Sequence, residues 1–250
     1  MPKPDHRKPL RKLLPPVAVL VASLFASFVS AAADPVYTVV KIDLRTEKLE
    51  LFLNDDAGIA FKRFDRLDAW LKTHGNRQLS FAVNAGMYHA DFSPVGLFVR
   101  DGREEAPLNL SSGTGNFFLK PNGVFLVSDA GPRVVESSEY PALVKSGMGI
   151  RLATQSGPLL LRHGVLHPAL IPNSDSRKIR NGVGISGHTA VFVISDTPVN
   201  FYEFALYFRD VLHCRDALYL DGTVSALHSN ALRRSDFVRE LGPILGVALP

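Results

Sequence analysis

Residues 217–222, Ala-Leu-Tyr-Leu-Asp-Gly, followed by Ser225, form the most informative stretch of this chain. Residues 216–220 make a short, largely apolar run, which is typical of a buried strand. Asp221 then stands at the carboxyl end of that strand, where a rigid element can present a reactive carboxylate. Gly222 lets the backbone turn sharply or approach a ligand closely. The simpler interpretation is an Asp-Gly turn with no further role, so the other polar segments of the chain decide between the two.

The first 33 residues are predicted to be a secretory signal peptide rather than part of the fold. Five basic residues precede an apolar run over residues 17–29, and small residues at 30–33 provide a site for signal peptidase. The apolar run is shorter than the about 20 residues that a membrane-spanning helix needs; an uncleaved anchor is the alternative. We expect cleavage before Asp34, export to the periplasm or the outside, and no stable membrane span in the mature chain, residues 34–250.

The charge balance and the cysteine content limit the range of functions. The chain has 28 Lys and Arg residues against 24 Asp and Glu residues; residues 1–33 hold five and one of these, so the remainder holds 23 of each. Such a balance does not favour nucleic acid binding. Cys214 is the single cysteine, which excludes an intramolecular disulfide and predicts a buried core thiol. The eight histidines show no metal-ligand spacing, so neither a metal nor another cofactor is expected.

Residues 34–250 are expected to form a single domain of the α+β (mixed α/β) class, with a largely antiparallel or mixed sheet packed by a few helices. Apolar spacing predicts helices over residues 64–73 and 199–212. Hairpin turns are predicted at residues 121–123 and 187–188. The predicted strands cover residues 36–44, 49–53, 79–83, 95–100, 116–119, 124–128, 150–154, 158–162, 182–185, 189–195 and 216–220.

Four short strings share one design, in which glycine and polar side chains adjoin an apolar strand. They are Asn-Ala-Gly-Met-Tyr at 84–88, Thr-Gln-Ser-Gly-Pro at 154–158, Arg-Asn-Gly-Val-Gly at 180–184 and Asp-Gly-Thr-Val-Ser at 221–225. Each string also has a purely structural interpretation. Asn84 could cap a turn, residues 155–158 could be a hairpin loop, and Arg180 could be a surface charge.

Taken together, the strings supply the groups that a catalytic site needs. Asp221 can act as a base or a nucleophile, and Arg180 can hold a phosphate or carboxylate through two parallel hydrogen bonds. The side chains that can bind sugar hydroxyls are Asn84, Gln155, Ser156 and Ser225. The chain has no Gly-x-Ser-x-Gly elbow, no P-loop and no dinucleotide fingerprint, which argues against lipase-like hydrolases and nucleotide-binding enzymes.

At these four strings the sequence resembles the phosphodiester glycosidase family, and especially its exported bacterial members. The resemblance extends from about Val36 to the C-terminus. The strings at 84–88 and 180–184 and the Ser-Gly-Pro step at 156–158 look like family motifs, and Asp221-Gly222 with Ser225 matches the family's aspartate-glycine-serine motif. One departure is that Thr223 and Val224 stand where the family often has further glycines.

The resemblance implies a hydrolase that cleaves the bond between a sugar's anomeric carbon and a phosphodiester phosphate, on an exported or cell-envelope glycan. Its partner would be a saccharide phosphodiester. Asp221, Arg180 and Asn84 are then expected to be catalytic, while the expected substrate-binding residues are Gln155, Ser156, Asn181 and Ser225. Since the leaving phosphate monoester is already a stable anion, a second carboxylic acid is less necessary than in ordinary glycosidases, and a cation such as Arg180 could stabilise the departing charge.

Two alternatives remain open at this point. Glu136, Glu203 and Asp91 are candidates for a second carboxylate. The whole chain could instead be a non-catalytic module that binds an anionic saccharide or a cell-wall polymer. Such a module would be expected to offer aromatic stacking surfaces, but Trp70, the only tryptophan, falls on the apolar face of a predicted helix.

Overall fold

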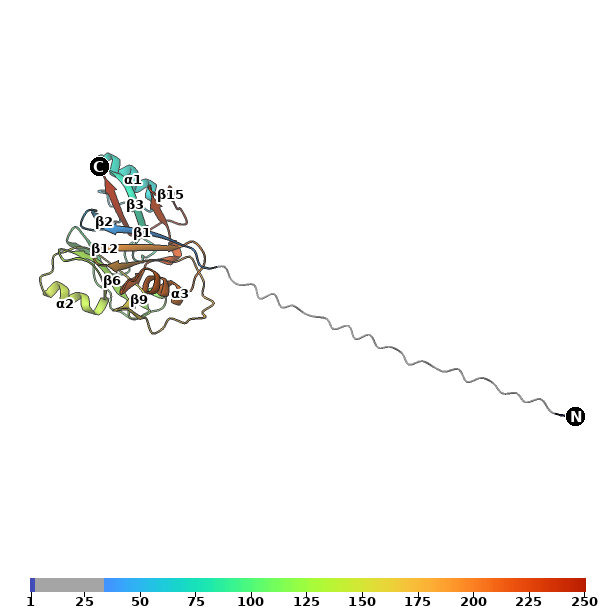
Figure 1. Ribbon diagram of the computed structural model, residues 1–250. Coiled ribbons are helices and arrows are strands. Elements are labelled where there is room, and N and C mark those ends of the chain that lie inside the picture. Colours follow the sequence, from blue (N-terminus) through green and yellow to red (C-terminus); the bar gives the residue numbers. More distant parts are fainter. Residues whose placement is uncertain (3–33) are drawn as a thin grey trace. The chain divides into compact units, whose positions relative to one another are not determined.

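The structure is a computed structural model of the 250-residue chain, and it describes residues 1–2 and 34–250 (Figure 1). The predicted signal peptide, residues 1–33, lies almost entirely outside the described residues. Within the described part of the chain, no helix is both long and apolar enough to cross a membrane. Residues 35–250 form one compact unit.

Three sheets make up most of this unit, and every strand pair within the described residues is antiparallel. The first sheet has the order β1 (Tyr37–Asp43), β12 (Thr189–Ser195), β11 (Asn181–Ser186), β13 (Asp216–Tyr219), β9 (Leu159–Arg162) and β10 (Val165–Leu166). The second has the order β15 (Arg234–Ser235), β14 (Leu227–Ser229), β3 (Gln78–Asn84), β16 (Ile244–Leu249) and β2 (Leu49–Phe52). The third has the order β5 (Arg103–Ala106), β4 (Phe98–Arg100), β8 (Ile150–Ser156), β6 (Gly123–Ser128) and β7 (Gly131–Glu136).

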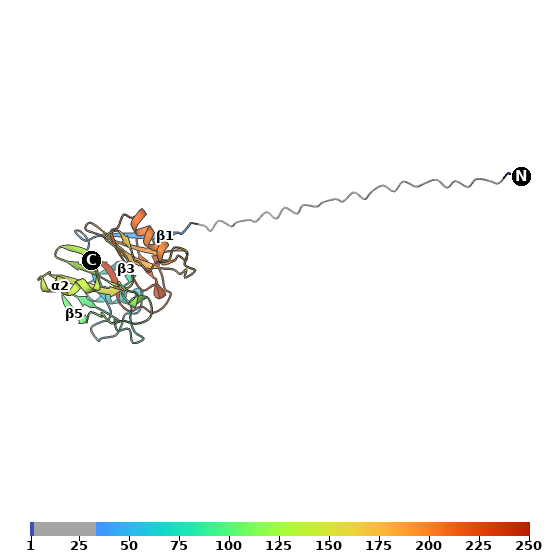
Figure 2. The same cartoon turned by 90° about the horizontal axis from the view of Figure 1, so that it is seen from below.

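Three short α-helices accompany the sheets: α1 (Phe64–Thr73), α2 (Tyr140–Lys145) and α3 (Phe201–Leu206). A π-helical turn, Tyr207–Val211, continues α3, and single 3₁₀ turns occur at Asn116–Phe118, Ser137–Glu139 and Gly222–Val224. Helix α1 lies beside β3 of the second sheet, and α3 lies beside β9 of the first (Figure 1). Seen from below, the C-terminus lies beside β3, as expected from the pairing of β16 with β3 (Figure 2).

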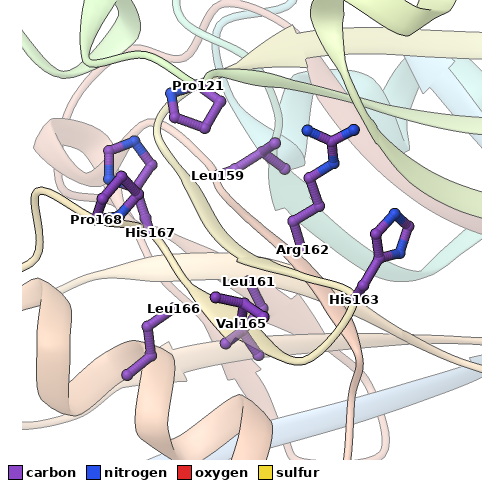
Figure 3. A pocket seen from close by; sticks show the side chains of 9 residues that line it. All are labelled: Pro121, Leu159, Leu161, Arg162, His163, Val165, Leu166, His167 and Pro168. Atoms are coloured by element: carbon purple, nitrogen blue, oxygen red, sulfur yellow. The ribbon is translucent and has the colours of Figure 1, made fainter.

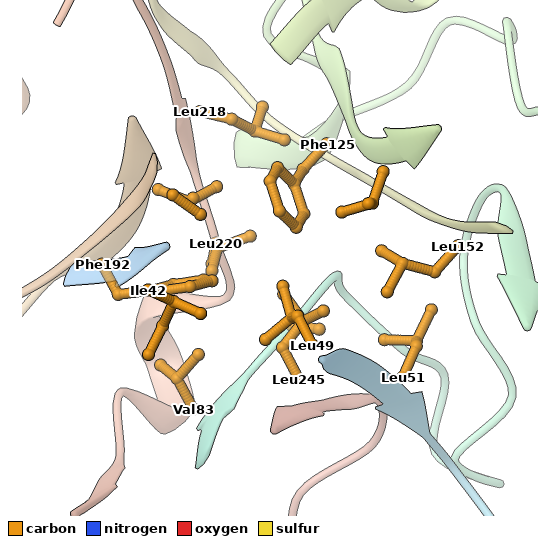
Figure 4. Close-up of a cluster of buried hydrophobic side chains, with 14 of the residues drawn as sticks. Ile42, Leu49, Leu51, Val83, Phe125, Leu152, Phe192, Leu218, Leu220 and Leu245 are labelled. Carbon is orange, nitrogen blue, oxygen red and sulfur yellow. The ribbon is translucent and has the colours of Figure 1, made fainter. Parts of the chain in front are cut away.

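One central core joins the three sheets (Figure 4). Its side chains include Phe192 and Leu218 from the first sheet, Val83 from the second, and Phe125 and Leu152 from the third. Each sheet therefore turns one face toward the same apolar cluster, and burial of this shared surface is the main force that holds the sheets together.

Alternation along β12 shows how the sequence produces this packing. Ala190, Phe192 and Ile194 point into the central core, whereas Val191 and Val193 pack against α3. Because successive side chains of a strand point to opposite faces, a strand covered on both sides is apolar throughout. The same alternation in β13 places Leu218 in the central core and Tyr219 on the side of α3.

Most predicted elements are confirmed, and the differences have local causes. Helix α1 has the predicted bounds, with Phe64, Leu67 and Leu71 buried. The predicted helix at 199–212 begins at Phe201, because Asn200 and Glu203 cap it reciprocally, and its second half is the π-helical turn. Helix α2 was not expected from the sequence.

The larger corrections concern long-range pairing. The fold is a sheet-dominated α+β structure with three sheets, where one sheet was expected. Residues 116–118 form a 3₁₀ turn instead of a strand, so residues 121–123 do not close a hairpin. Gln155 and Ser156 belong to β8 instead of a hairpin loop, since β8 and β9 lie in different sheets. The predicted hairpin at 187–188 is confirmed by the pairing of β11 with β12.

Candidate active site

The ends of three strands bring the polar strings together. Asn84 ends β3, Asn181 begins β11, and Asp221 follows β13 directly after Leu220. Because β11 and β13 are antiparallel neighbours, with Gly182 opposite Tyr219, the start of one lies beside the end of the other. The geometry therefore gathers side chains that are far apart in the sequence.

A buried hydrogen-bonded network connects these strand ends. The Asn84 side-chain oxygen Oδ1 accepts bonds from Asn181 Nδ2 (3.0 Å) and from the Ala226 backbone N–H (3.0 Å). Asn84 Nδ2 donates to the backbone oxygen of Asp221 (2.7 Å), and Ser225 Oγ donates to Asn181 Oδ1 (3.1 Å). Asn84, Asn181 and Ser225 are at most 4% exposed, so this network holds the backbone around Asp221.

Asp221 is fixed both through its backbone and through its carboxylate. Its N–H donates to the Ala85 oxygen (3.2 Å), and its Oδ1 accepts from the Thr223 N–H (3.1 Å), which caps the 3₁₀ turn. The residue keeps some exposure, yet the surrounding protein desolvates the carboxylate. Burial therefore raises the pKa of Asp221, and the hydrogen bonds from Thr223 oppose this effect.

Tyr219 is a site residue that sequence analysis missed. Its hydroxyl lies so close to Gly222 that a Cβ atom at position 222 would overlap it. Glycine is therefore needed at position 222 because it leaves space for the Tyr219 hydroxyl. The backbone at Gly222 does not adopt a conformation that only glycine favours. Burial raises the pKa of Tyr219 to about 12, so the hydroxyl stays protonated at neutral pH and can donate a hydrogen bond. The sequence could have indicated this residue. Tyr219 lies two positions before Asp221, and residues two apart along a strand point to the same face.

The Arg180 guanidinium lies beside the Tyr219 ring, and Arg180 is almost fully buried, at 1% exposed. Its Cζ atom lies 3.6 Å from the centre of the Phe201 ring and 5.6 Å from that of Tyr219. Nε donates to the Val199 oxygen (2.8 Å) and one terminal nitrogen donates to the Ser176 oxygen (2.7 Å). Burial lowers the pKa of Arg180, but a guanidinium keeps its charge. The interpretation as a surface charge is wrong, and two of the donors expected to bind a phosphate bond main-chain oxygens instead.

Gln155 and Ser156 differ from the other predicted site residues. The Gln155 amide oxygen accepts from the N–H groups of Leu97 (3.0 Å) and Asn109 (2.9 Å), and its nitrogen donates to the Asn109 oxygen and to Ser137 Oγ. These four bonds use the full capacity of the amide, so Gln155 holds a loop and has no bond left for a sugar. Ser156 Oγ is buried and has no partner within the described residues.

The candidates for a second carboxylate are all engaged elsewhere. Glu136 forms an ion pair with Arg162. Glu203 caps α3 and pairs with Arg177 (2.8 Å), and Asp91 accepts from the backbone and side chain of Ser93. In the part of the chain that the structure describes, no group of three or more His, Cys, Asp or Glu side chains could hold a metal ion.

Two further features lie apart from the network. Cys214 is 2% exposed, as predicted, and burial raises the pKa of its thiol to about 11, so it is not an activated nucleophile. A cavity of about 370 Å³ lies beside the β9–β10 hairpin (Figure 3). Its wall is largely apolar, from side chains such as Leu159, Leu161 and Leu166, and it includes none of the predicted site residues.

The family model for phosphodiester glycosidases matches residues 77–247 of this chain. The chain belongs to the phosphodiester glycosidase family. The matched range includes the whole Asn84–Asn181–Ser225 network as well as Asp221. The resemblance seen in the sequence motifs is thereby confirmed.

Three known proteins are similar to this chain. The uncharacterized protein YigE of Escherichia coli (strain K12) is 38% identical over 201 residues, which cover 79% of this chain and 77% of YigE. The zebrafish N-acetylglucosamine-1-phosphodiester alpha-N-acetylglucosaminidase catalytic domain, auto-inhibited by its pro-peptide, superposes with a TM-score of 0.56 at 14% identity, covering 87% of this chain and 85% of that one. A hypothetical protein from Synechocystis gives 0.53 at 14% identity, over 86% and 59% of the two chains. At such identities these two structures show a shared fold.

Proposed function

We propose that this phosphodiester glycosidase family member hydrolyses sugar-1-phosphodiesters, with Asp221 as its nucleophile or base. The observation that carries the proposal is the setting of Asp221. Its carboxylate is desolvated, and its backbone is held by hydrogen bonds with Asn84 and Ala85. The protonated Tyr219 hydroxyl lies against Gly222, which directly follows Asp221. We also propose the exported space as the place of action, from the character of residues 1–33.

The reaction would break the bond between the anomeric carbon and the phosphate oxygen. In the base route, Asp221 takes a proton from water, the water oxygen attacks the anomeric carbon, and the bonding electron pair leaves with the phosphate monoester. In the nucleophile route, a carboxylate oxygen attacks first and water releases the sugar in a second step. Arg180 would contribute a fixed positive charge beside Tyr219, which favours the negative charge that develops on the departing phosphate.

Isotope labelling tests which bond is cleaved. The purified protein is incubated with phosphodiesters of glucose, mannose and N-acetylglucosamine in ¹⁸O-labelled water, and the released phosphate monoester is analysed by mass spectrometry. We expect no label in the phosphate, whose oxygens do not exchange with water, because attack occurs at carbon. Label in the phosphate would mean attack at phosphorus and thus a phosphodiesterase. Binding without hydrolysis across the panel would favour the non-catalytic saccharide module.

A lysine at position 180 tests whether the planar guanidinium is required. An ammonium keeps the charge but cannot bond the Val199 and Ser176 oxygens in one plane or stack on Phe201 in the same way. Arg180→Lys is expected to lower the free energy of unfolding by about 2 kcal/mol, through the loss of bonds to a charged group, and to lower turnover with it. Thermal denaturation and initial rates measure both effects.

The matched control for this variant is Arg177→Lys, which changes a half-exposed arginine paired with Glu203. Its stability and turnover should be close to those of the wild type, because exposed ion pairs contribute little to stability. Wild-type stability and turnover in Arg180→Lys would show that position 180 needs only a charge.

A further inference from the structure

The segment at 239–243 runs along the string at 84–88, on which the active site depends. Tyr88 Oη donates to the backbone oxygen of Glu240 (2.5 Å), and a Cβ atom at Gly242 would overlap the Tyr88 ring. The Ala85 N–H donates to the Pro243 oxygen (2.8 Å). The oxygen of the same Ala85 accepts from the Asp221 N–H (3.2 Å). One residue therefore links this segment directly to the proposed attacking group.

Arg239 is the exposed cation of this segment. Within residues 34–250, no side-chain hydrogen bond or ion pair occupies its guanidinium. Two other cations, by contrast, are paired: Lys62 with Glu240 (3.3 Å) and Arg234 with Asp236 (2.9 Å). The charges of Arg239 and Asp221 both act on Tyr88. Burial raises the pKa of the Tyr88 hydroxyl to about 12, the Asp221 charge adds to this increase, and the Arg239 charge opposes it.

We propose that Arg239 binds the phosphate of the substrate and that Tyr88 positions it, an inference that rests on the proposed function. A phosphodiester anion adjacent to the attacked carbon needs an accessible cation. Arg180 is 1% exposed and two of its N–H groups bond main-chain oxygens, whereas Arg239 is exposed. A guanidinium matches two phosphate oxygens with two parallel hydrogen bonds. Tyr88 acts through its bond to the Glu240 oxygen, which fixes the backbone directly after Arg239.

Binding of a matched pair of ligands tests the proposal without requiring turnover. Glucose 1-phosphate and glucose differ only in the phosphate, and their dissociation constants are measured by calorimetry on the full chain. We expect Arg239→Ala to weaken binding of glucose 1-phosphate by about tenfold or more, the usual size of a hydrogen bond to a charged group, and to leave glucose unchanged. The affinity of Arg239→Lys for glucose 1-phosphate should lie between those of the wild type and Arg239→Ala, since lysine keeps only the point charge.

Arg215→Ala is the matched control, because it removes an exposed arginine at the opposite end of β13 from Asp221. It should bind both ligands as the wild type does. Equal binding of glucose 1-phosphate by Arg239→Ala and by the wild type would overturn the proposal. So would a wild type that binds glucose 1-phosphate no more tightly than glucose.

A double-mutant cycle tests the positioning role of Tyr88. Tyr88→Phe removes only the hydroxyl that bonds Glu240. We expect this variant to weaken glucose 1-phosphate binding in the wild-type background and to have no further effect in the Arg239→Ala background, because the two residues act through one contact. Additive losses would show that Tyr88 does not act through Arg239 and would overturn its role.

These measurements separate the proposal from the proposed function. Binding that depends on Arg239, in a protein that hydrolyses no sugar-1-phosphodiester, would refute the enzyme and support the phosphate site. Hydrolysis with an unchanged KM in Arg239→Ala would support the enzyme and refute the phosphate site.

Discussion

Replacing Asp221 with asparagine is expected to remove most hydrolysis of sugar-1-phosphodiesters while the protein stays folded. An amide can neither attack the anomeric carbon nor take a proton from water. The loss should be about 10²- to 10⁴-fold in kcat, the usual contribution of a positioned base, or more if Asp221 is the nucleophile. Asparagine has nearly the same shape, so the bonds that hold the Asp221 backbone to Asn84 and Ala85 are retained.

The stability of the same variant should change in the opposite direction. Burial raises the pKa of Asp221 in the folded protein. Its ionisation therefore costs folding free energy as the pH rises from the usual carboxyl pKa through the raised one. Asparagine removes this cost, and the melting temperature of Asp221→Asn at neutral pH is expected to equal or exceed that of the wild type. At a pH below the usual carboxyl pKa, the two proteins should be alike.

The pH dependence of the rate provides a second measurement. Either proposed role of Asp221 needs the ionised carboxylate, so kcat/KM should fall on the acid side of a midpoint that lies above the ordinary carboxyl pKa of 3.8. Asp129→Asn, which changes an exposed carboxylate, should alter neither the rate nor the midpoint. Full activity in Asp221→Asn would show that the Asp-Gly pair forms a turn with no catalytic role.

The sequence predicts which polar residues lie together better than it predicts the contacts that each of them makes. Asp221, Asn84, Asn181 and Ser225 are polar residues beside predicted strands, and antiparallel pairing brings these strand ends together. Which polar group faces protein and which faces solvent depends on distant residues. Gln155 is saturated by bonds to Leu97, Asn109 and Ser137, which no local pattern connects with it.

Arg180 shows the same limit. Its partners, the oxygens of Ser176 and Val199, come from the two segments that flank β11 and β12, and the stacking ring comes from Phe201 on α3. Periodicity identified these elements, and β12 and α1 have the predicted bounds. Periodicity could not assign β8 and β9 to different sheets, because that choice depends on contacts between residues distant in the sequence.

Removing the Asn84 side chain is expected to cause the largest loss of stability among the substitutions considered. Asn84→Ala leaves the Ala226 N–H and the Asp221 oxygen without their partner, at a position that is 1% exposed. The Asn181 amide loses its bond to the Asn84 side chain and keeps its 3.3 Å bond to the backbone oxygen of residue 84. An unpaired buried polar group costs about 1–3 kcal/mol, so the total should be about 3 kcal/mol or more. For a domain of this size, that corresponds to a fall in the melting temperature of roughly 6–12 °C.

Two further variants show whether the network itself is responsible. Asn116→Ala changes an exposed asparagine. Its free energy of unfolding should be within about 0.5 kcal/mol of the wild-type value. Asn84→Asp can still accept from Asn181 and Ala226 but cannot donate to Asp221, and it buries a second carboxylate near the first. Burial should raise the pKa of that new carboxyl, so Asn84→Asp should be closer to the wild type in mildly acidic buffer than at neutral pH. If Asn84→Ala melts within about 2 °C of the wild type, a shift of less than about 1 kcal/mol, the network does not hold Asp221 in place.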